Sequence, residues 1–206
     1  MKDIVILIGP SGAGKSMIAN ILKEKYSATE FISTTTRSPR DGEIDGVSYY
    51  FKTEEEFDEM LEKKELIEDS IYAGNHYGLT KTTVFDTLEK SDLCVAVLDK
   101  EGAFAVKRLF TDYSDVTVSF IFVHAKISTL YLRMVNRGDS VEKIAERLQN
   151  IIDNREFLQG SFCDYTLFNE DLTETMQLLD HFMQKILKKI NWLSKKLEYF
   201  FLNYLW

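Results

Sequence analysis

The sequence has few of the residues on which disulfide-rich, metal-binding or membrane-spanning proteins depend. It contains two cysteines and three histidines in 206 residues, and the histidines lack the spacing of a zinc site. Two isolated cysteines, Cys94 and Cys163, indicate a reducing compartment rather than a disulfide framework. No apolar run is long enough to cross a bilayer, and the first residues lack the layout of a signal peptide. We therefore expect a cytoplasmic protein.

Basic residues are also scarce relative to acidic ones. The chain carries 25 lysines and arginines against 33 aspartates and glutamates, which gives a formal net charge of -8. Long nucleic acid requires a basic surface, so we expect no partner of that kind. A single nucleotide is compatible with this charge, because a local group of arginines is enough to bind it. With only two prolines and no low-complexity tract, the chain is expected to form one compact domain.

Short apolar runs alternate with stretches of helical periodicity along most of the chain. This alternation predicts βαβ units and a mostly parallel sheet, which binds ligands at the carboxyl ends of its strands. Residues 31–77 break the alternation and are expected to form an inserted small subdomain, with a helix capped by Thr53 and Glu56. The expected strands are residues 4–8, 31–35, 49–51, 93–98, 116–123 and 165–168, with 66–72 extended, and the expected helices are 17–26, 53–63, 82–90, 128–135, 141–158 and a long helix from about 171.

A glycine-rich segment between the first strand and the first helix fits the pattern G-x-x-x-x-G-K-[ST]. Glycines let the backbone wrap closely around phosphate, and the helix that follows adds its positive dipole end. In this pattern the lysine reaches the β- and γ-phosphates and the serine hydroxyl binds Mg²⁺. A turn with a chance glycine pattern is the alternative, but both required flanks are present. The segment, called the P-loop below, consists of Gly9, Pro10, Ser11, Gly12, Ala13, Gly14, Lys15 and Ser16.

A second motif runs from Ser33 through Thr-Thr-Thr-Arg-Ser-Pro-Arg-Asp-Gly to Phe51, and a further block covers residues 65–68 and 74–78. These blocks give the chain a resemblance to the guanylate kinase family. The similarity spans about residues 3–187. It implies a P-loop NTPase three-layer α/β fold with a mostly parallel sheet, in a domain of residues 1–190. It also implies a GMP-binding insertion at about 32–80 and a helical lid at about 133–158, followed by a C-terminal helical extension, 191–206.

Four residues of these blocks are suited to binding a monophosphate. Arg37 and Arg40 are spaced to converge from one loop, and guanidinium groups grip phosphate oxygens in fork geometry. Tyr49 and Tyr77 can add phenolic donors, and in the family the matching four residues hold the acceptor's phosphate. The alternatives are solvated arginines on a surface loop and tyrosines that pack in a core.

Two further residues are suited to reading the base. Glu68 offers a carboxylate for the N1–H and N2–H₂ donors of guanine, and Ser33 can hydrogen-bond its O6. A carboxylate facing N1 rejects adenine, which presents an acceptor at that position. A lone Glu68 could instead be an exposed strand carboxylate.

The remaining candidates concern the transferred phosphoryl group. Asp99 follows an apolar strand, as a Walker-B acid does. The resemblance implies that it faces the acceptor nucleotide or the water shell of the metal. The alternative is an aspartate that caps the next helix. Arg133, Arg137 and Arg147 resemble the family's lid arginines, which would clamp the donor phosphates; the alternative is that they are exposed on amphipathic helices. Asn169 matches a position that approaches adenine in the family.

The resemblance implies a guanylate kinase that moves the γ-phosphoryl of ATP to GMP or dGMP with Mg²⁺. The alternatives are a catalytically inactive module that binds protein partners, and a related kinase with another acceptor. Four departures from the family pattern bear on this choice. They are Leu79 where relatives place Ser or Thr, Val97 for the first acid of a D-x-D pair, His124 to Lys126 for a proline pair, and a short interval from Arg137 to Arg147.

An apolar stripe with four- and three-residue steps runs from Leu172 to Tyr204. A C-terminal helix that packs on the sheet accounts for its first half. The second half, residues 191–206, predicts burial against a second copy of the chain or contact with a membrane surface. Light scattering of full-length and tail-truncated protein would test the first of these.

Overall fold

The computed structural model describes residues 1–72 and 74–187, which form two sheets and the helices around them. The main sheet has five strands, all of them parallel. This confirms the mostly parallel sheet expected from the alternating pattern. The strand order is β2 (Thr29–Glu30), β7 (Leu93–Val97), β1 (Lys2–Ile8), β8 (Val116–His124) and β9 (Tyr165–Phe168).

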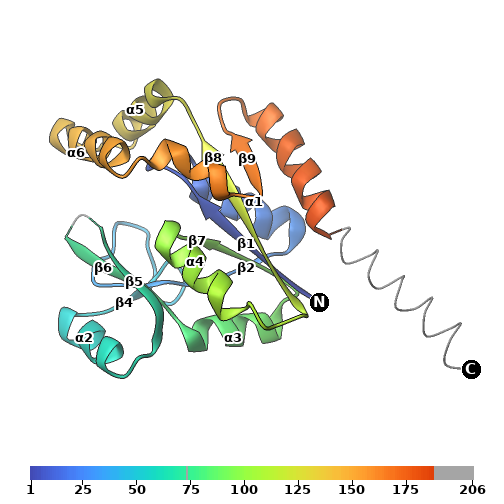
Figure 1. The fold of residues 1–206 in the computed structure, drawn as a ribbon. Coiled ribbons are helices and arrows are strands. Elements are labelled where there is room, and N and C mark those ends of the chain that lie inside the picture. The colour runs from blue at the N-terminus through green and yellow to red at the C-terminus, as the bar shows by residue number, and fades with distance from the viewer. Residues whose placement is uncertain (73, 188–206) are drawn as a thin grey trace, which may run out of the picture.

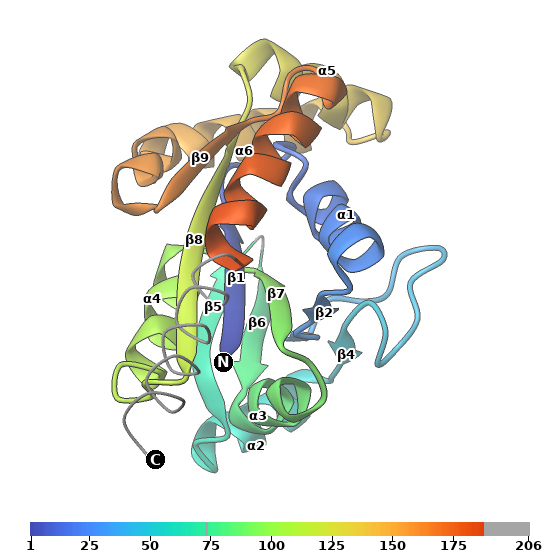
Figure 2. The ribbon, with the colours of Figure 1, turned by 90° about the vertical axis from the view of Figure 1, so that its right-hand side faces the viewer.

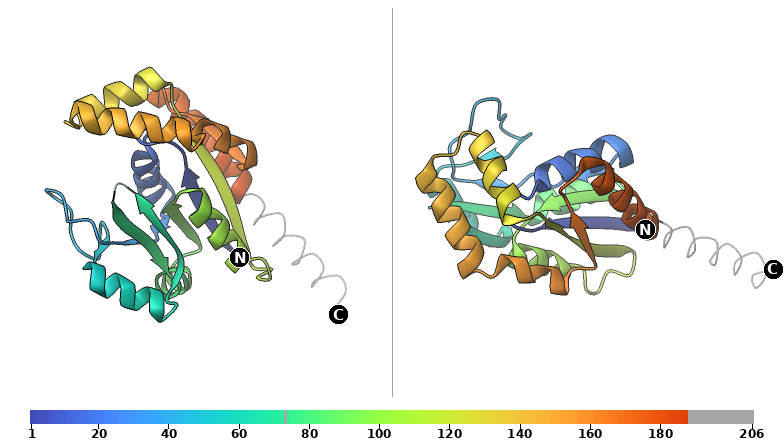
Figure 3. Two further views of the ribbon diagram at one scale, coloured as in Figure 1. Left: turned by 60° about the vertical axis from the view of Figure 1, so that its left-hand side comes forward. Right: turned by 90° about the horizontal axis from the view of Figure 1, so that it is seen from above.

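The central strand β1 shows why the domain has three layers. Its successive side chains point to opposite faces of the sheet, and both faces are buried. Val5 and Leu7 join a core with α1 (Lys15–Tyr26) and the helix of residues 172–187. Ile4 and Ile6 join a second core with α3 (Lys81–Lys90) and α4 (Lys100–Leu109). The sheet therefore lies between two helical layers, as Figure 3 shows from above.

The second sheet is built from the segment that interrupts the alternation. Its order is β4 (Tyr50–Phe51), β3 (Thr34–Thr35), β6 (Asn75–Thr80) and β5 (Leu66–Tyr72), with antiparallel β3–β6 and β5–β6 pairs. Helix α2 (Glu54–Glu62) lies beside it, and its capping box of Thr53 and Glu56 forms as expected. This sheet and α2 lie on one side of the molecule, and the helices α5 (Ile127–Asn136) and α6 (Val141–Asp153) lie on the opposite side (Figures 1 and 2).

Three local expectations differ from the structure. Of the strand expected at 31–35, only residues 34–35 form a strand, β3, which pairs in the small sheet; β2, at residues 29–30, precedes the expected strand and pairs with the main sheet. The helix expected at 141–158 ends at Asp153, where Arg155 takes a left-handed conformation (φ 49°) and a 3₁₀ helix η1 (Glu156–Phe162) follows. Strand β6 was not expected as an element, and α4 was anticipated only as the helix that Asp99 would cap, without bounds.

The C-terminal stripe packs on the main sheet over the part that the structure describes. Leu179, Met183 and Ile186 are buried in the core with α1, and Asp171 caps the helix through the Glu174 amide. The second half of the stripe, residues 191–206, lies outside the described residues. Among those that are described, no helix is both long and apolar enough to cross a membrane.

Candidate active site

A cleft of about 620 Å³ brings together most of the residues expected to bind nucleotide. Its walls come from the P-loop, the small sheet, the first turn of α4, and the segment from α5 to η1. The lining includes Gly9, Ser11, Lys15, Ser33, Arg37, Arg40, Tyr49, Glu68, Tyr77, Asp99, Arg137 and Arg147. The other expected residues, Pro10, Gly12, Ala13, Gly14, Ser16, Arg133 and Asn169, are not part of this lining.

The P-loop joins β1 to α1 and places Lys15 at the first helical position. The Lys15 ammonium donates hydrogen bonds to the carbonyls of Gly9 (2.6 Å) and Pro10 (3.0 Å). The pKa of Lys15 is lowered to about 8, mainly by burial, which Glu156 opposes and the nearby Arg147 reinforces. Ser16 follows on α1 and is exposed. The loop therefore presents a half-buried lysine to the cleft and an exposed serine beside it.

Two residues expected at the ATP site, Arg133 and Asn169, form hydrogen bonds to the backbone of the P-loop. Arg133 donates to the carbonyl oxygens of Ala13 (3.1 Å) and Asn169 (2.7 Å). The buried Asn169 amide also donates to Ala13 (2.7 Å). Gly14 has φ +97°, and a Cβ there would lie 2.3 Å from Asn169 Nδ2, so only glycine fits this contact. In this structure Arg133 and Asn169 therefore hold the loop's backbone instead of facing the cleft.

The acceptor-side arginines are organised by Glu43, a residue to which the sequence analysis gave no role. Its Oε1 accepts from Arg37 Nη2 at 2.9 Å, and its Oε2 accepts from the Arg40 amide at 2.8 Å. The Arg37 guanidinium also lies 5.3 Å from the centroid of the Tyr49 ring, whose own neighbour is Tyr77 at 6.1 Å. The four expected phosphate-binding residues thus lie together on one wall, with one carboxylate tying both arginines to the loop.

Glu68 lies on β5 directly opposite Leu79 on β6, and its carboxyl packs against Gly102 of α4. A Cβ on Gly102 would lie 2.9 Å from Glu68 Cδ, so the absence of a side chain there makes room for the carboxyl. Leu79 is fully buried in the core beneath, and so occupies no open position in the cleft. The residue opposite Glu68 on β6 is therefore a buried apolar one.

Asp99 lies at the start of α4 and at the edge of the cleft. It is the N-cap of α4, where its Oδ1 accepts from the Gly102 amide at 2.8 Å, and it also lines the cleft. Glu156, at the start of η1, lines the same cleft. Burial raises the pKa of Glu156, Lys15 lowers it and Asp99 raises it. Sequence reasoning missed Glu156 because a continuous helix was expected there.

Two lid arginines converge on the P-loop side of the cleft. Arg147 Nη1 donates to Ser11 Oγ at 2.7 Å, and its Nε lies 3.8 Å from Asp139 Oδ2. Arg137 forms an ion pair with the same aspartate and thereby holds the pKa of Asp139 below its usual value. Asp139 therefore links the two arginines across the turn between α5 and α6.

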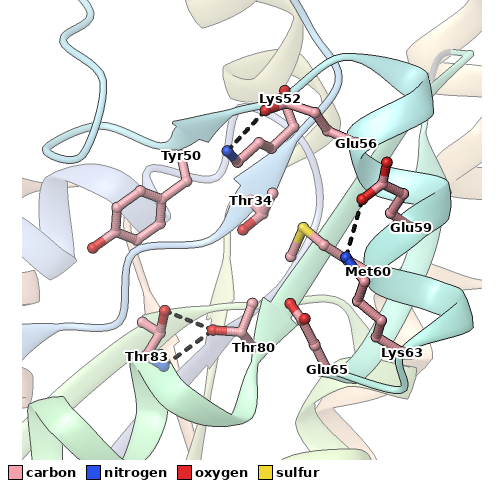
Figure 4. Close-up of a pocket in the computed structure, with 10 residues that line it drawn as sticks. All are labelled: Thr34, Tyr50, Lys52, Glu56, Glu59, Met60, Lys63, Glu65, Thr80 and Thr83. Atoms are coloured by element: carbon pink, nitrogen blue, oxygen red, sulfur yellow. Dashed lines mark hydrogen bonds and ion pairs between the residues drawn. The ribbon is translucent and has the colours of Figure 1, made fainter.

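A smaller cavity of about 310 Å³ lies between α2, the small sheet and the start of α3 (Figure 4). Its lysines are paired with its glutamates, Lys52 with Glu56 and Lys63 with Glu59. None of the expected site residues lines it. The larger cleft is therefore the candidate active site.

Comparisons with known proteins agree with this arrangement. A family model described as guanylate kinase matches residues 1–186. The chain is similar to a guanylate kinase of Helicobacter pylori, with 37% identity over 179 residues that cover 86% of this chain and 84% of the relative. It is 34% identical to one from Trichodesmium erythraeum over 179 residues, which cover 86% of this chain and 93% of that protein. A crystal structure of guanylate kinase from Anaplasma phagocytophilum has the same fold, with a TM-score of 0.65, 24% identity and coverage of 91% and 86%.

Proposed function

The chain belongs to the guanylate kinase family, and we propose that it transfers the γ-phosphoryl group of ATP to GMP or dGMP. The observation that carries this proposal is that Lys15 of the P-loop lines the same cleft as Arg37 and Arg40. Two separate groups of cations in one cavity suit two phosphate-bearing ligands whose reacting ends must meet. Phosphoryl transfer depends mainly on such positioning and on neutralising charge.

The donor nucleotide is assigned to the P-loop and to the lid, residues 133–158. Lys15 would neutralise the β- and γ-phosphates, and Arg137 and Arg147 would neutralise charge on the group in transfer. Ser11 holds Arg147 at the loop, which supports this placement. The attacking oxygen belongs to the acceptor's phosphate, so the protein needs no nucleophile of its own.

The acceptor nucleotide is assigned to the insertion, residues 32–80. Arg37 and Arg40 would hold its phosphate, with hydroxyl donors from Tyr49 and Tyr77. Glu68 would accept from guanine N1–H and N2–H₂, and Ser33 would contact O6. All six residues line the cleft, and this common location supports the assignment.

The residues present fit a magnesium ion that arrives with the nucleotide. Mg²⁺ takes oxygen ligands and keeps several waters, so one protein hydroxyl with nearby carboxylates is enough. Ser16 would supply the hydroxyl, and Asp99 and Glu156 carry carboxylates in the adjoining cleft. Among the described residues there is no group of three or more His, Cys, Asp or Glu side chains that could hold a metal by itself. When bound, Mg²⁺ would neutralise charge on the phosphate oxygens.

Release of ADP in the presence of GMP tests the proposed function. The wild type should release ADP only when ATP, Mg²⁺ and GMP or dGMP are all present. Lys15→Ala should abolish this release, because the cation at the β- and γ-phosphates is removed. Lys90→Ala is the matched control, since Lys90 is exposed on α3 away from the cleft. Folded wild-type protein that releases no ADP with GMP would contradict the proposal, and a screen of other nucleoside monophosphates would then identify the acceptor.

A further inference from the structure

The carboxyl of Glu68 has an unusual environment for a group that must accept two hydrogen bonds. Its Oε2 is buried and has no hydrogen-bond partner among the described residues. The fully buried Leu79 lies opposite it on β6, and Gly102 of α4 lies against the carboxyl itself. Leu79 has no donor group, and Gly102 has no side chain. An ionised carboxylate in such a place loses hydration that the protein does not replace.

The ionisable groups around Glu68 add to this effect. On α4 they are Asp99 at the N-cap, and Lys100 and Glu101, which are ion-paired with each other at 3.8 Å. Tyr77 lies on β6, and the exposed Asp69 follows Glu68 on its own strand. Burial, then Asp99, then Asp69 raise the pKa of Glu68 to about 8. The carboxyl is therefore mostly protonated at neutral pH before a nucleotide binds.

Guanine, however, requires the ionised form. Its N1–H and N2–H₂ are both donors, so both carboxylate oxygens must accept. The neutral acid carries a hydroxyl hydrogen on one oxygen, and this hydrogen would face a donor. The bound base supplies two hydrogen bonds, including one to the Oε2 that the protein leaves without a partner, and this favours the ionised form in the complex.

We propose that binding of GMP expels the proton of Glu68, so that guanine recognition is coupled to proton release at neutral pH. The O–H bond of the acid breaks, its proton passes to water or buffer, and guanine keeps its N1–H. This inference rests on the proposed function, because it requires the base to bind at Glu68. Leu79 and Gly102 act here as positioning residues, since they set the environment of the carboxyl without contacting substrate phosphate.

Isothermal titration calorimetry of GMP in buffers with different ionisation enthalpies measures the released protons directly. We expect release of about 0.8 proton per GMP at pH 7.5 and about 0.2 at pH 8.5, from a group that titrates near 8. The apparent affinity should rise about eightfold from pH 7 to pH 8.5. The phosphate of GMP, with a second pKa of about 6, is largely ionised over this range.

Two variants separate Glu68 from other groups in the cleft, such as Lys15 and Glu156. Glu68→Gln should remove the proton release, because an amide does not titrate. Glu89→Gln, the matched control, should keep it, because Glu89 is exposed on α3 and does not line the cleft. Circular dichroism would establish that both variants are folded.

The outcomes distinguish this inference from the proposed function. If GMP binds the wild type with the same enthalpy in every buffer at pH 7.5, proton coupling is wrong while guanylate kinase activity stands. Equal proton release by wild type and Glu68→Gln would also overturn it. Folded wild-type protein that does not bind GMP at all would contradict both proposals.

Discussion

Replacing Gly102 with alanine should weaken GMP binding while leaving the fold intact or more stable. The new methyl group would lie 2.9 Å from Glu68 Cδ and about as close to its two oxygens, at 3.1 and 3.2 Å. These contacts are too short for real Cβ atoms, so something must shift. The carboxyl is the free end of a flexible side chain and moves more readily than the helix backbone. We therefore expect Gly102→Ala to move the carboxyl group of Glu68 away from its position against α4.

The size of the effect follows from the hydrogen bonds at risk. A hydrogen bond to a charged group contributes about 1.5–3 kcal/mol. If displacement of Glu68 costs one of its two bonds to guanine, kcat/KM for GMP should fall about 10- to 150-fold. Alanine in place of glycine inside a helix stabilises by about 0.5–1 kcal/mol, which offsets part of the crowding. Weaker GMP binding without loss of stability is therefore the expected signature.

Steady-state kinetics with GMP and ATP varied separately, together with urea denaturation, would measure both quantities. The KM for ATP should change little, because Lys15 and the lid are untouched. Repeating the substitution in a Glu68→Gln background completes a double-mutant cycle, and there Gly102→Ala should have a much smaller effect. An unchanged KM for GMP in folded Gly102→Ala would refute the reasoning, as would an equal loss in both backgrounds.

Two further substitutions test the supports of the cleft. Glu43→Gln should raise the KM for GMP about tenfold, because the side-chain amide of glutamine has one oxygen and cannot accept from both the Arg37 side chain and the Arg40 backbone amide. Steady-state kinetics in which the KM values for GMP and ATP changed equally would contradict this. Asn169→Ala removes the 2.7 Å hydrogen bond to the Ala13 carbonyl of the P-loop, so it should lower the free energy of unfolding by about 1–3 kcal/mol and raise the KM for ATP. Chemical denaturation that finds the variant as stable as the wild type would argue against a supporting role for Asn169.

The sequence predicted most reliably those features whose signal is local. The P-loop between an apolar strand and a helix was placed correctly, because its glycines, Lys15 and both flanks are contiguous. The capping box at Thr53 likewise depends on residues three positions apart, and it forms as expected. The resemblance then supplied the arginines and Glu68, and the structure places them on the same cleft.

Features that depend on distant contacts were missed. Gly102 was given no role, because its effect comes from packing against Glu68, which lies in another element. Glu156 faces the cleft because the chain turns at Arg155, and neither glycine nor proline marks that turn. The split between β2 and β3 arises because one short segment pairs with two different sheets. In each case tertiary packing decided the outcome, and no local pattern carries that information.

Two departures from the family pattern that the resemblance implies lie opposite Glu68 or in the cleft that Glu68 lines. Leu79 replaces a hydroxyl residue directly across from Glu68, and it is buried in the core instead of facing a ligand. Val97 replaces an acid in the lining of the same cleft. Neither aliphatic side chain can donate to Glu68 Oε2, which has no partner among the described residues. Because the protein leaves this oxygen unsatisfied, a ligand that supplies two donors gains more than one that supplies a single donor. These replacements are therefore expected to make guanine recognition more dependent on the ionisation of Glu68, without changing which base is preferred.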